Sequence, residues 1–230
     1  YTFDSAQVVR GFLSVLHEVP ELEKPLRRAC DWILTQVRPD GKIDTPDLGS
    51  WNMPDGTLIT DNVHIYCVTP LLEAGQRLKE DRYIETAKKS LAYYRSRPDI
   101  AQFNVLSHFF GYIMEALVDL GEKELYTKGL EQALKAQRPD GSIPAFPDVK
   151  WVCSTGLAQI AIAMAKAGMK EPAAKAFRYL QTLQNPSGGF YGGYGKKAFY
   201  FPQEEISWAV KYFLDLYLLV KDSRWPSDRT

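Results

Sequence analysis

Three carboxylates and two imidazoles stand where helices are expected to begin, and they are the side chains best suited to acid/base chemistry. They are Asp4, His64, His108, Glu204 and Glu205. A carboxyl group beside aromatic rings has a raised pKa, and an imidazole titrates near neutral pH, so both types can transfer protons under ordinary conditions. We interpret these five residues as the candidate catalytic set.

Each of these residues also has a structural alternative. An aspartate at a helix start commonly caps the helix, so Asp4 and also Asp61 are candidate N-caps. Glu204 and Glu205 begin the last predicted helix, where negative charge complements the helix dipole. A lone histidine is more often hydrogen-bonded in a core or at a rim than catalytic. The chemical and the structural interpretations are both open at this stage.

A loop at residues 186–203 carries five glycines and several aromatic side chains. The rings of Tyr191, Tyr194 and Tyr200 have flat apolar faces and polar tips, and Trp208 follows shortly after. Such groups suit a sugar ring, which offers apolar C–H faces and hydroxyl groups; the alternative is a loop that packs on its own aromatics. The other candidate substrate-binding residues are polar or aromatic and lie at or near helix starts: Gln7, Arg10, Trp51, Asp61, Tyr112, Trp151 and Gln159.

Metal and disulfide chemistry find little support. Cys30, Cys67 and Cys153 are odd in number and form no C-x-x-C pair, which argues against a disulfide framework. No local spacing joins the histidines, the aspartates and Cys153 into a ligand set. We expect neither a metal site nor a cofactor.

Apolar residues recur at three- and four-residue spacing almost throughout, and this pattern predicts an all-α protein. The expected helices cover roughly residues 4–18, 22–37, 61–77, 81–96, 106–120, 123–137, 157–165, 171–184 and 204–221. Short connections join them in pairs, so the nine helices make about five hairpins with one helix unpaired.

A recurring phrase ends the second helix of the pairs. It reads Arg-Pro-Asp-Gly from residues 38 and 138, Arg-Pro-Asp from residue 97, and Asn-Pro-Ser-Gly-Gly from residue 185. Proline and glycine make this a helix stop and a turn, and its return at 41 to 59 residues is typical of a helical-hairpin repeat. First helices with polar starts and second helices with one apolar stripe favour an inner and an outer ring. We predict a single (α/α) toroid domain over residues 1–230.

The segments FDSAQVVRGFL, VCSTGLAQIAIA and GGFYGGYGKKAFYFPQEEISWAVKYFLDL, together with the turns, resemble the (α/α) toroid superfamily. This group includes prenyltransferase and squalene-cyclase repeat proteins, unsaturated glucuronyl hydrolases and the helical domain of glucuronyl epimerases. The resemblance is strongest to little-characterised toroid proteins associated with bacterial polysaccharide metabolism. It spans nearly the whole chain and implies a protein that acts on carbohydrate.

This sequence lacks some motifs of the superfamily, and their absence disfavours some of its reactions. The Gln-Trp turn pattern Q-x-x-x-G-x-W is half present from Gln137 to Gly141, with Ile143 in place of the aromatic residue, and the acidic cyclase motif is missing. Terpene cyclisation is therefore disfavoured. By resemblance to unsaturated glucuronyl hydrolases, an inner-helix aspartate would protonate the substrate, and Asp4 or Asp61 would have to fill that role.

Composition excludes other classes. The 28 basic residues balance the 28 acidic ones, so nucleic acid is not an expected partner, and no apolar run is long enough to cross a membrane. We expect a soluble protein, with the cytoplasm favoured, that acts by acid/base chemistry as a hydrolase, lyase or epimerase. Its expected substrate is a polysaccharide or oligosaccharide, including those that contain uronic acid. The alternatives are a toroid that binds glycan or protein without chemistry and, less favoured, one that handles isoprenoid or lipid.

Overall fold

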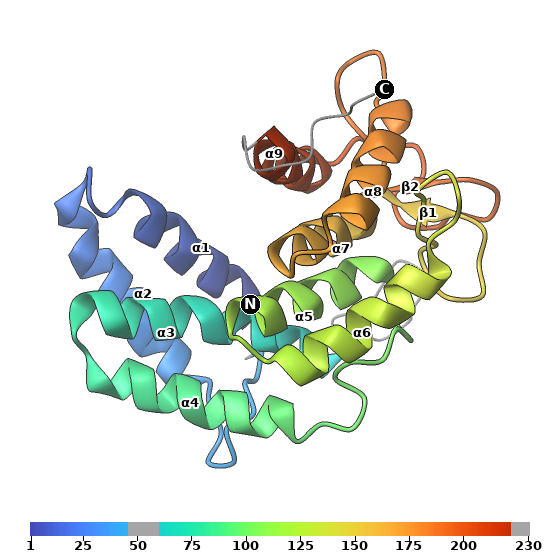
Figure 1. Ribbon diagram of the computed structural model, residues 1–230. Coiled ribbons are helices and arrows are strands. Elements are labelled where there is room, and N and C mark those ends of the chain that lie inside the picture. The colour runs from blue at the N-terminus through green and yellow to red at the C-terminus, as the bar shows by residue number, and fades with distance from the viewer. Residues whose placement is uncertain (46–59, 222–230) are drawn as a thin grey trace. The chain divides into compact units, whose positions relative to one another are not determined.

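The computed structural model describes residues 1–45 and 60–221, and the regular secondary structure of these residues is almost wholly helical (Figure 1). The α-helices are α1 (Thr2–Val15), α2 (Glu23–Thr35), α3 (Val68–Leu78), α4 (Asp81–Arg95), α5 (Ser107–Asp119), α6 (Lys123–Ala136), α7 (Ser154–Lys166), α8 (Lys170–Leu183) and α9 (Ser207–Lys221). Two 3₁₀ helices, η1 (Pro20–Leu22) and η2 (Asp61–Cys67), and two short strands, β1 (Val152–Cys153) and β2 (Gly193–Tyr194), complete the described elements. The all-α prediction and its nine helices are confirmed.

Two helix starts differ from the prediction. The helix expected from residue 61 begins as the 3₁₀ helix η2 and becomes α-helical only at Val68. The last helix begins at Ser207, not at Glu204, because the preceding backbone is already paired: Glu205 bridges Tyr191, and the Ile206 amide donates to the Phe190 carbonyl at 3.1 Å.

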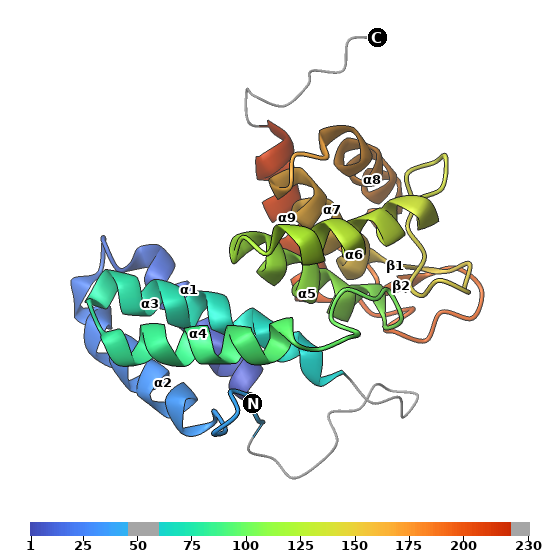
Figure 2. The same cartoon turned by 60° about the horizontal axis from the view of Figure 1, so that its bottom comes forward.

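The described residues fall into two compact units. The first contains α1 to α4, from residues 1–45 and 61–100. Here α3 and α4 form one hairpin and α1 and α2 another, with α1 also contacting α3 and η2 (Figures 1 and 2). Apolar residues of all four helices, such as Val9, Leu26, Leu71 and Ala87, are buried between them.

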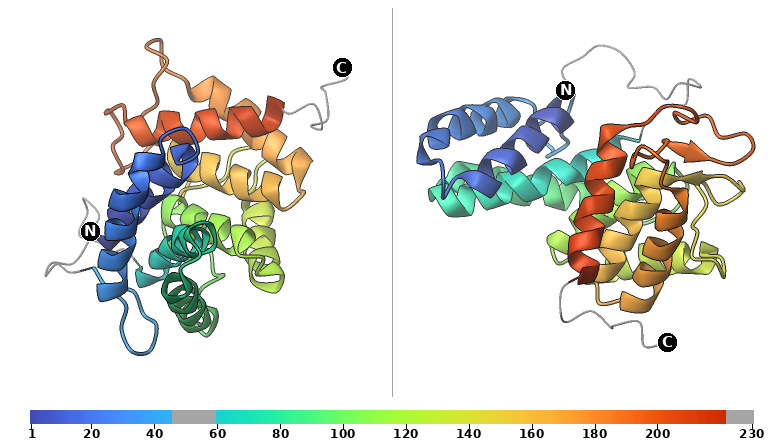
Figure 3. Two further views of the ribbon diagram at one scale, coloured as in Figure 1. Left: turned by 90° about the vertical axis from the view of Figure 1, so that its left-hand side faces the viewer. Right: turned by 90° about the horizontal axis from the view of Figure 1, so that it is seen from above.

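The second unit, from residue 101 onward, is built around α7. Helices α5, α8 and α9 all pack on α7, and its start is joined to β1, which pairs antiparallel with β2 (Figure 3, right). Every residue from Ser107 to Leu117 of α5 and from Ser154 to Met164 of α7 is buried, whereas α6 and α8 bury only one stripe. This division matches the predicted difference between first and second helices of the hairpins.

The recurring proline phrase forms the same turn three times, starting at residues 38, 138 and 185. In each copy the glycine amide donates to the carbonyl of the first residue, at 2.9, 2.9 and 2.8 Å. The side chain of the third residue, Asp40, Asp140 or Ser187, accepts the amide of the fifth, at 3.0, 2.9 and 3.1 Å. A phrase found by reading the sequence therefore encodes one turn geometry.

The residue two places after each turn glycine is apolar and fully buried: Ile43, Ile143 and Phe190. A glutamine before the turn supports two copies, since the Nε2 amides of Gln137 and Gln184 donate to the carbonyls of Gly141 and Gly188 at 3.2 and 2.9 Å. The third copy thus holds the glutamine, the glycine and an aromatic residue of the Gln-Trp pattern. The prediction placed the pattern only at the second copy, whereas the third copy, from Gln184 to Phe190, carries it more fully.

The first two turns each pack against an outer helix of the following hairpin. Gly41 and Gly141 have φ of +96° and +90°, which glycine adopts without strain. A Cβ atom on Gly41 would lie 2.5 Å from the Lys89 carbonyl oxygen of α4, and one on Gly141 would lie 2.2 Å from the Lys175 carbonyl oxygen of α8. Glycine is therefore required both for the backbone conformation and for the close approach.

An ion-pair group joins the C-terminal ends of α5 and α7. Lys166 Nζ lies 3.0 Å from the buried Glu115 carboxylate and 2.9 Å from that of Asp119. Burial lowers the pKa of the Lys166 ammonium, but together the two carboxylates raise it by more than burial lowers it, so its pKa lies above the usual value. The pairing compensates the buried charge of Glu115.

Replacing the turn glycine tests this packing. We expect Gly141→Ala to lower the free energy of unfolding by more than Gly168→Ala, which has a similar φ of +85° but no atom within 4 Å of the added Cβ. The control carries only the backbone strain, about 1–2 kcal/mol, and Gly141→Ala adds overpacking of about 1–3 kcal/mol. Urea unfolding of both variants measures the difference; equal losses would show that the turn does not pack tightly on α8.

Candidate functional site

The starts of α5 and α7 lie in close contact because two glycines leave room there. A Cβ atom on Gly156 would lie 2.2 Å from Ser107 Oγ and 2.5 Å from the His108 amide nitrogen. One on Gly111 would lie 2.6 Å from the Cβ of Gln159. The contact therefore brings His108 of α5 and Gln159 of α7 face to face.

His108 and Gln159 share a hydrogen bond inside this contact. His108 Nδ1 lies 2.5 Å from Gln159 Oε1, and the two residues are 5% and 0% exposed. An amide oxygen only accepts, so His108 Nδ1 carries the hydrogen and Nε2 presents a lone pair. Among residues 1–45 and 60–221, nothing is hydrogen-bonded to His108 Nε2.

Aromatic residues surround the imidazole. The His108 ring centroid lies 4.6 Å from that of Tyr112 and 5.7 Å from that of Tyr200. The Tyr200 hydroxyl accepts a hydrogen bond from Trp208 Nε1 at 3.1 Å, which leaves its own hydrogen available to another acceptor. We refer to His108, Tyr112, Gln159, Tyr200 and Trp208 as the His108 cluster; the sequence analysis selected all five.

Burial controls the protonation of the cluster. It lowers the pKa of His108 from 6.5 to about 4, although the hydrogen bond that His108 donates to Gln159 acts in the opposite direction, so the imidazole is neutral at pH 7. Burial raises the pKa of the Tyr200 phenol well above its usual value, and that of the adjacent Cys153 thiol to about 12. The cluster therefore offers a neutral imidazole beside a protonated phenol, and Cys153 is not a thiolate.

The amide nitrogen of Gln159 is buried and has no hydrogen-bond partner in the part of the chain that the structure describes. A buried donor left unpaired costs about 1–3 kcal/mol. The close contact of the two helices stabilises an arrangement that is unfavourable for this side chain taken alone.

A second aromatic group lies at the loop before α7. Trp151 is buried, and its ring centroid lies 5.1 Å from that of Phe199 and 6.1 Å from that of half-buried Phe146. Gly195, in the loop, passes so close that a Cβ there would lie 3.2 Å from the Trp151 backbone. The predicted sugar-stacking residue Trp151 is thus packed beneath loop residues, with Phe146 and Phe199 partly open to solvent.

Tyr191 and Tyr194 are half-buried and organise the loop itself. The Tyr194 hydroxyl accepts the Tyr191 amide at 2.8 Å and donates to Asn185 Oδ1 at 3.3 Å. Ser154, at the start of α7, donates its hydroxyl to the Tyr191 carbonyl at 2.6 Å. These bonds hold the loop against the start of α7, and substrate contact by the two tyrosines stays a prediction.

The adjacent glutamates Glu204 and Glu205 differ in their surroundings. Both are exposed, but the Glu205 carboxylate accepts hydrogen bonds from Ser187 Oγ and from Asn185 Nδ2, the latter at 2.8 Å. These bonds lower the pKa of Glu205, so its carboxylate is ionised at neutral pH and secures the third turn. Proton transfer by either glutamate stays a prediction.

In the first unit, Asp4, Gln7 and Arg10 lie along α1. Tyr1 is the N-cap of α1 and Asp4 lies exposed in its first turn, so the expected capping by Asp4 is wrong. The Arg10 guanidinium stacks over the Tyr66 ring at 4.0 Å, and the Gln7 amide nitrogen is buried without a hydrogen bond to any described residue. The structure brings these three side chains to one helix.

Asp61 and His64 lie at the start of η2. His64 is buried, its Nδ1 donates to the Asp61 carbonyl at 3.2 Å, and its Nε2 lies 3.2 Å from the Thr45 hydroxyl. Burial lowers the pKa of His64. The Asp61 carboxylate pairs with Lys42 Nζ at 2.7 Å. Both ring nitrogens of His64 are engaged, unlike those of His108; Trp51 lies outside the described residues.

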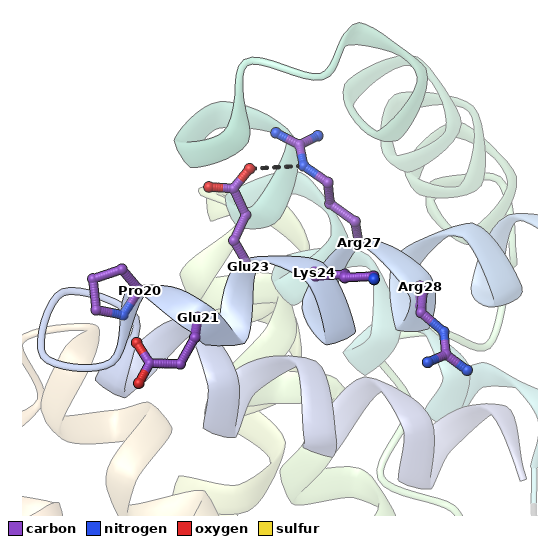
Figure 4. A pocket seen from close by; sticks show the side chains of 6 residues that line it. All are labelled: Pro20, Glu21, Glu23, Lys24, Arg27 and Arg28. Carbon is purple, nitrogen blue, oxygen red and sulfur yellow. Dashed lines mark hydrogen bonds and ion pairs between the residues drawn. The ribbon is translucent and has the colours of Figure 1, made fainter.

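A hollow of about 390 Å³ lies on the outer surface of the first unit (Figure 4). It is lined by Pro20, Glu21, Glu23, Lys24, Arg27 and Arg28. The Glu23 carboxylate and the Arg27 guanidinium pair across it at 2.9 Å, and no predicted site residue contributes to it. This hollow is therefore separate from the chemistry considered above.

Sequence reasoning missed the residues that shape the His108 cluster. Gly111 and Gly156 read as ordinary small residues within apolar helices, and nothing in their spacing predicts that α5 and α7 meet there. Tyr212, whose ring lies 5.9 Å from that of Tyr112, reads as part of the apolar stripe of the last helix. A pattern of glycine near the start of two first helices is the only signal that could have revealed the contact.

Comparison with known proteins identifies the fold. No protein-family model and no curated protein sequence matches this chain. Solved structures do. A possible member of the GH105 family from Salmonella enterica subsp. enterica serovar Paratyphi A matches with a TM-score of 0.65 at 13% identity, covering 94% of this chain and 70% of its own.

Two further structures agree. One described as a polysaccharide lyase matches with a TM-score of 0.63 at 12% identity, over 96% of this chain and 74% of that one. The other, a variant of the unsaturated glucuronyl hydrolase UGL with the oligosaccharide dGlcA-Glc-Rha-Glc, has a TM-score of 0.66 at 14% identity, over 87% and 69%. The chain has the (α/α) toroid fold, as its sequence predicted. Within the described ranges, no helix is long and apolar enough to cross a membrane.

The buried imidazole predicts a pH-dependent stability. Because the folded-state pKa of His108 lies below its unfolded value, the unfolded chain takes up a proton first as pH falls, and stability is lost between pH 6.5 and about 4. The loss from this group is about 3 kcal/mol. Between pH 7 and pH 4, the free energy of unfolding should therefore fall by about 3 kcal/mol less in His108→Asn than in the wild type. Identical pH dependence of the two proteins, measured by urea unfolding, would contradict the buried neutral state.

Proposed function

We propose that this protein acts on a polysaccharide or oligosaccharide that contains uronic acid, by acid/base chemistry centred on the His108 cluster. The observation that carries the proposal is the buried, neutral His108, whose Nε2 has no hydrogen bond to any described residue and which lies beside the protonated Tyr200 phenol. A base and an acid of this kind suit the removal of a proton next to a carboxylate. The known structures of similar fold include a polysaccharide lyase and a glycan-bound hydrolase, which supports a carbohydrate substrate.

Of the three reaction types that acid/base chemistry allows, elimination and epimerisation fit this cluster. In elimination, His108 Nε2 takes the proton from carbon five of the uronate, the electron pair of that C–H bond forms the C4–C5 double bond, and the C4–O bond breaks. The leaving oxygen takes a proton from Tyr200, which later regains one from solvent. In epimerisation, His108 Nε2 takes the carbon-five proton on one face, the Tyr200 phenol delivers a different proton to carbon five on the opposite face, both groups then exchange protons with solvent, and no C–O bond breaks.

Hydrolysis needs a different pair of groups. It requires a carboxylic acid to protonate the leaving oxygen and a carboxylate to act as base or nucleophile. Asp4 and Glu204 are exposed, and the Glu205 carboxylate is held ionised by the third turn. We therefore rank hydrolysis below proton abstraction.

A second candidate function is glycan binding without chemistry. The partly exposed rings of Phe146 and Phe199, supported by Trp151, are the observation that favours it. Flat exposed rings stack on sugars whether or not a reaction follows. In that case the His108 cluster would serve packing alone.

Turnover of uronate-containing oligosaccharides separates these functions. We expect the wild type to form a product with the ultraviolet absorbance of a C4–C5 double bond, or to exchange the carbon-five proton in deuterated water. His108→Asn and Tyr200→Phe should each lower kcat by about 10²–10⁴-fold, while His17→Gln, at an exposed position, leaves it unchanged.

The other outcomes decide against the proposal. Turnover that survives both cluster substitutions but is lost in Asp4→Asn would identify a hydrolase-type carboxylate mechanism. Glycan binding without any turnover would identify the non-catalytic function. If the protein shows no binding and no turnover, a uronate-containing glycan is excluded as its ligand.

A further inference from the structure

Gln159 is placed to act through His108 and not on a ligand. It is 0% exposed, its Oε1 lies 2.5 Å from His108 Nδ1, and its Nε2 is buried from solvent. A side chain with no accessible atom meets a substrate only through its neighbour. The sequence analysis expected Gln159 to bind substrate directly, and its burial points to a different role.

We propose that Gln159 is a positioning residue, whose amide oxygen holds His108 as the Nδ1–H tautomer so that Nε2 is the atom that accepts the substrate proton. Gly111 also contributes to this positioning, because the absence of a side chain there leaves the space that the Gln159 side chain occupies. The catalytic consequence rests on the function proposed above, whereas the tautomer itself does not.

Gly111 matters because the atoms it would displace cannot move away easily. A Cβ atom at position 111 would lie 2.6 Å from Gln159 Cβ, and 3.5 Å from its Cδ and Oε1. The Cβ of Gln159 is fixed to the backbone of α7, which is buried along this face. An alanine at position 111 must therefore separate the two helices or turn the Gln159 amide away from the imidazole.

Among the residues that the structure describes, Gln159 alone is hydrogen-bonded to the His108 ring. Its neighbours on α5 and in the loop before α9 bring the phenols of Tyr112 and Tyr200, and burial keeps the pKa of Tyr200 high enough for the phenol to stay protonated. From α7 comes only the neutral Gln159, and within the described part of the chain no charged group affects the pKa of His108. The imidazole is therefore neutral at pH 7, and its two neutral tautomers are the states between which Gln159 selects.

The tautomer can be read directly by ¹H–¹⁵N NMR of the imidazole nitrogens in the full-length protein, with no glycan present. The chain has three histidines, so His17→Gln and His64→Gln assign the His108 signals. We expect wild-type His108 to be the Nδ1–H tautomer and Gln159→Leu to show a mixture with the Nε2–H form. Gly111→Ala should shift in the same direction, whereas Gly11→Ala, a helical glycine with no atom within 4 Å of an added Cβ, should not.

Gln159→Glu supplies a readout that a purely structural role would not change. Its carboxylate still accepts from Nδ1, but its charge stabilises the imidazolium and raises the pKa of His108 from about 4. We expect the acid limb of the kcat profile to move to higher pH in this variant. Gln159→Leu should lower kcat by about 10²-fold with little change in KM, as for a group that acts only in the proton-transfer step.

Three results would overturn the proposal: a wild-type His108 in the Nε2–H form, a tautomer unchanged in Gln159→Leu, or an acid limb unmoved in Gln159→Glu. If Gln159→Leu does not fold, the Gln159→Glu titration by NMR decides, and an unshifted pKa of His108 counts against the proposal. If the tautomer behaves as expected but wild type turns over no glycan, the proposed function fails while the positioning of His108 stands.

Discussion

The contact between α5 and α7 is the constraint on which the second unit depends. Gly111 and Gly156 allow the two helix starts to approach, and the Glu115–Lys166 ion pair joins the opposite ends, so the helices are fixed at both ends of their contact. The burial of His108 follows from this geometry, because a wider separation would admit water around the imidazole. The same packing holds the Gln159 amide nitrogen, which has no hydrogen bond to any described residue. Burying this group costs free energy, and the packed helices on both sides keep it in place.

Two buried histidines show how much depends on a single hydrogen bond. Burial lowers the pKa of both His64 and His108. His64 uses both ring nitrogens, one toward the Asp61 carbonyl and one toward the Thr45 hydroxyl, which is the arrangement of a histidine that stabilises structure. His108 uses one nitrogen and leaves the other without a hydrogen bond to any described residue, so the same burial that makes it neutral leaves it with a lone pair for other chemistry.

Sequence reasoning succeeds here where a local pattern decides the outcome. The helices follow from apolar periodicity, and the turns from proline and glycine at fixed offsets, because both depend on residues a few positions apart. Reasoning fails where the deciding partner is distant in sequence. Glu205 reads as a free carboxylate at a helix start, but Asn185 and Ser187, which precede it by a long loop, bind its carboxylate, and the helix begins only at Ser207. All five members of the His108 cluster were selected from the sequence and their roles stay predictions, while the pairing of His108 with Gln159 requires knowing which helices adjoin.

The repeated turn has a consequence for how such a chain can diversify. At its first two copies the turn glycine abuts the backbone of an outer helix in the next hairpin, at Lys89 and at Lys175, and a buried Ile43 or Ile143 follows at once. The distance between successive outer helices is therefore determined by the turn, which is about six residues long, and by the apolar residue buried directly after it. Between Ile143 and the next inner helix, α7, the chain carries the half-buried Phe146 beside the buried Trp151. Side chains that face solvent in this segment can change, and with them the surface that a ligand meets, while the turn that packs on α8 is kept.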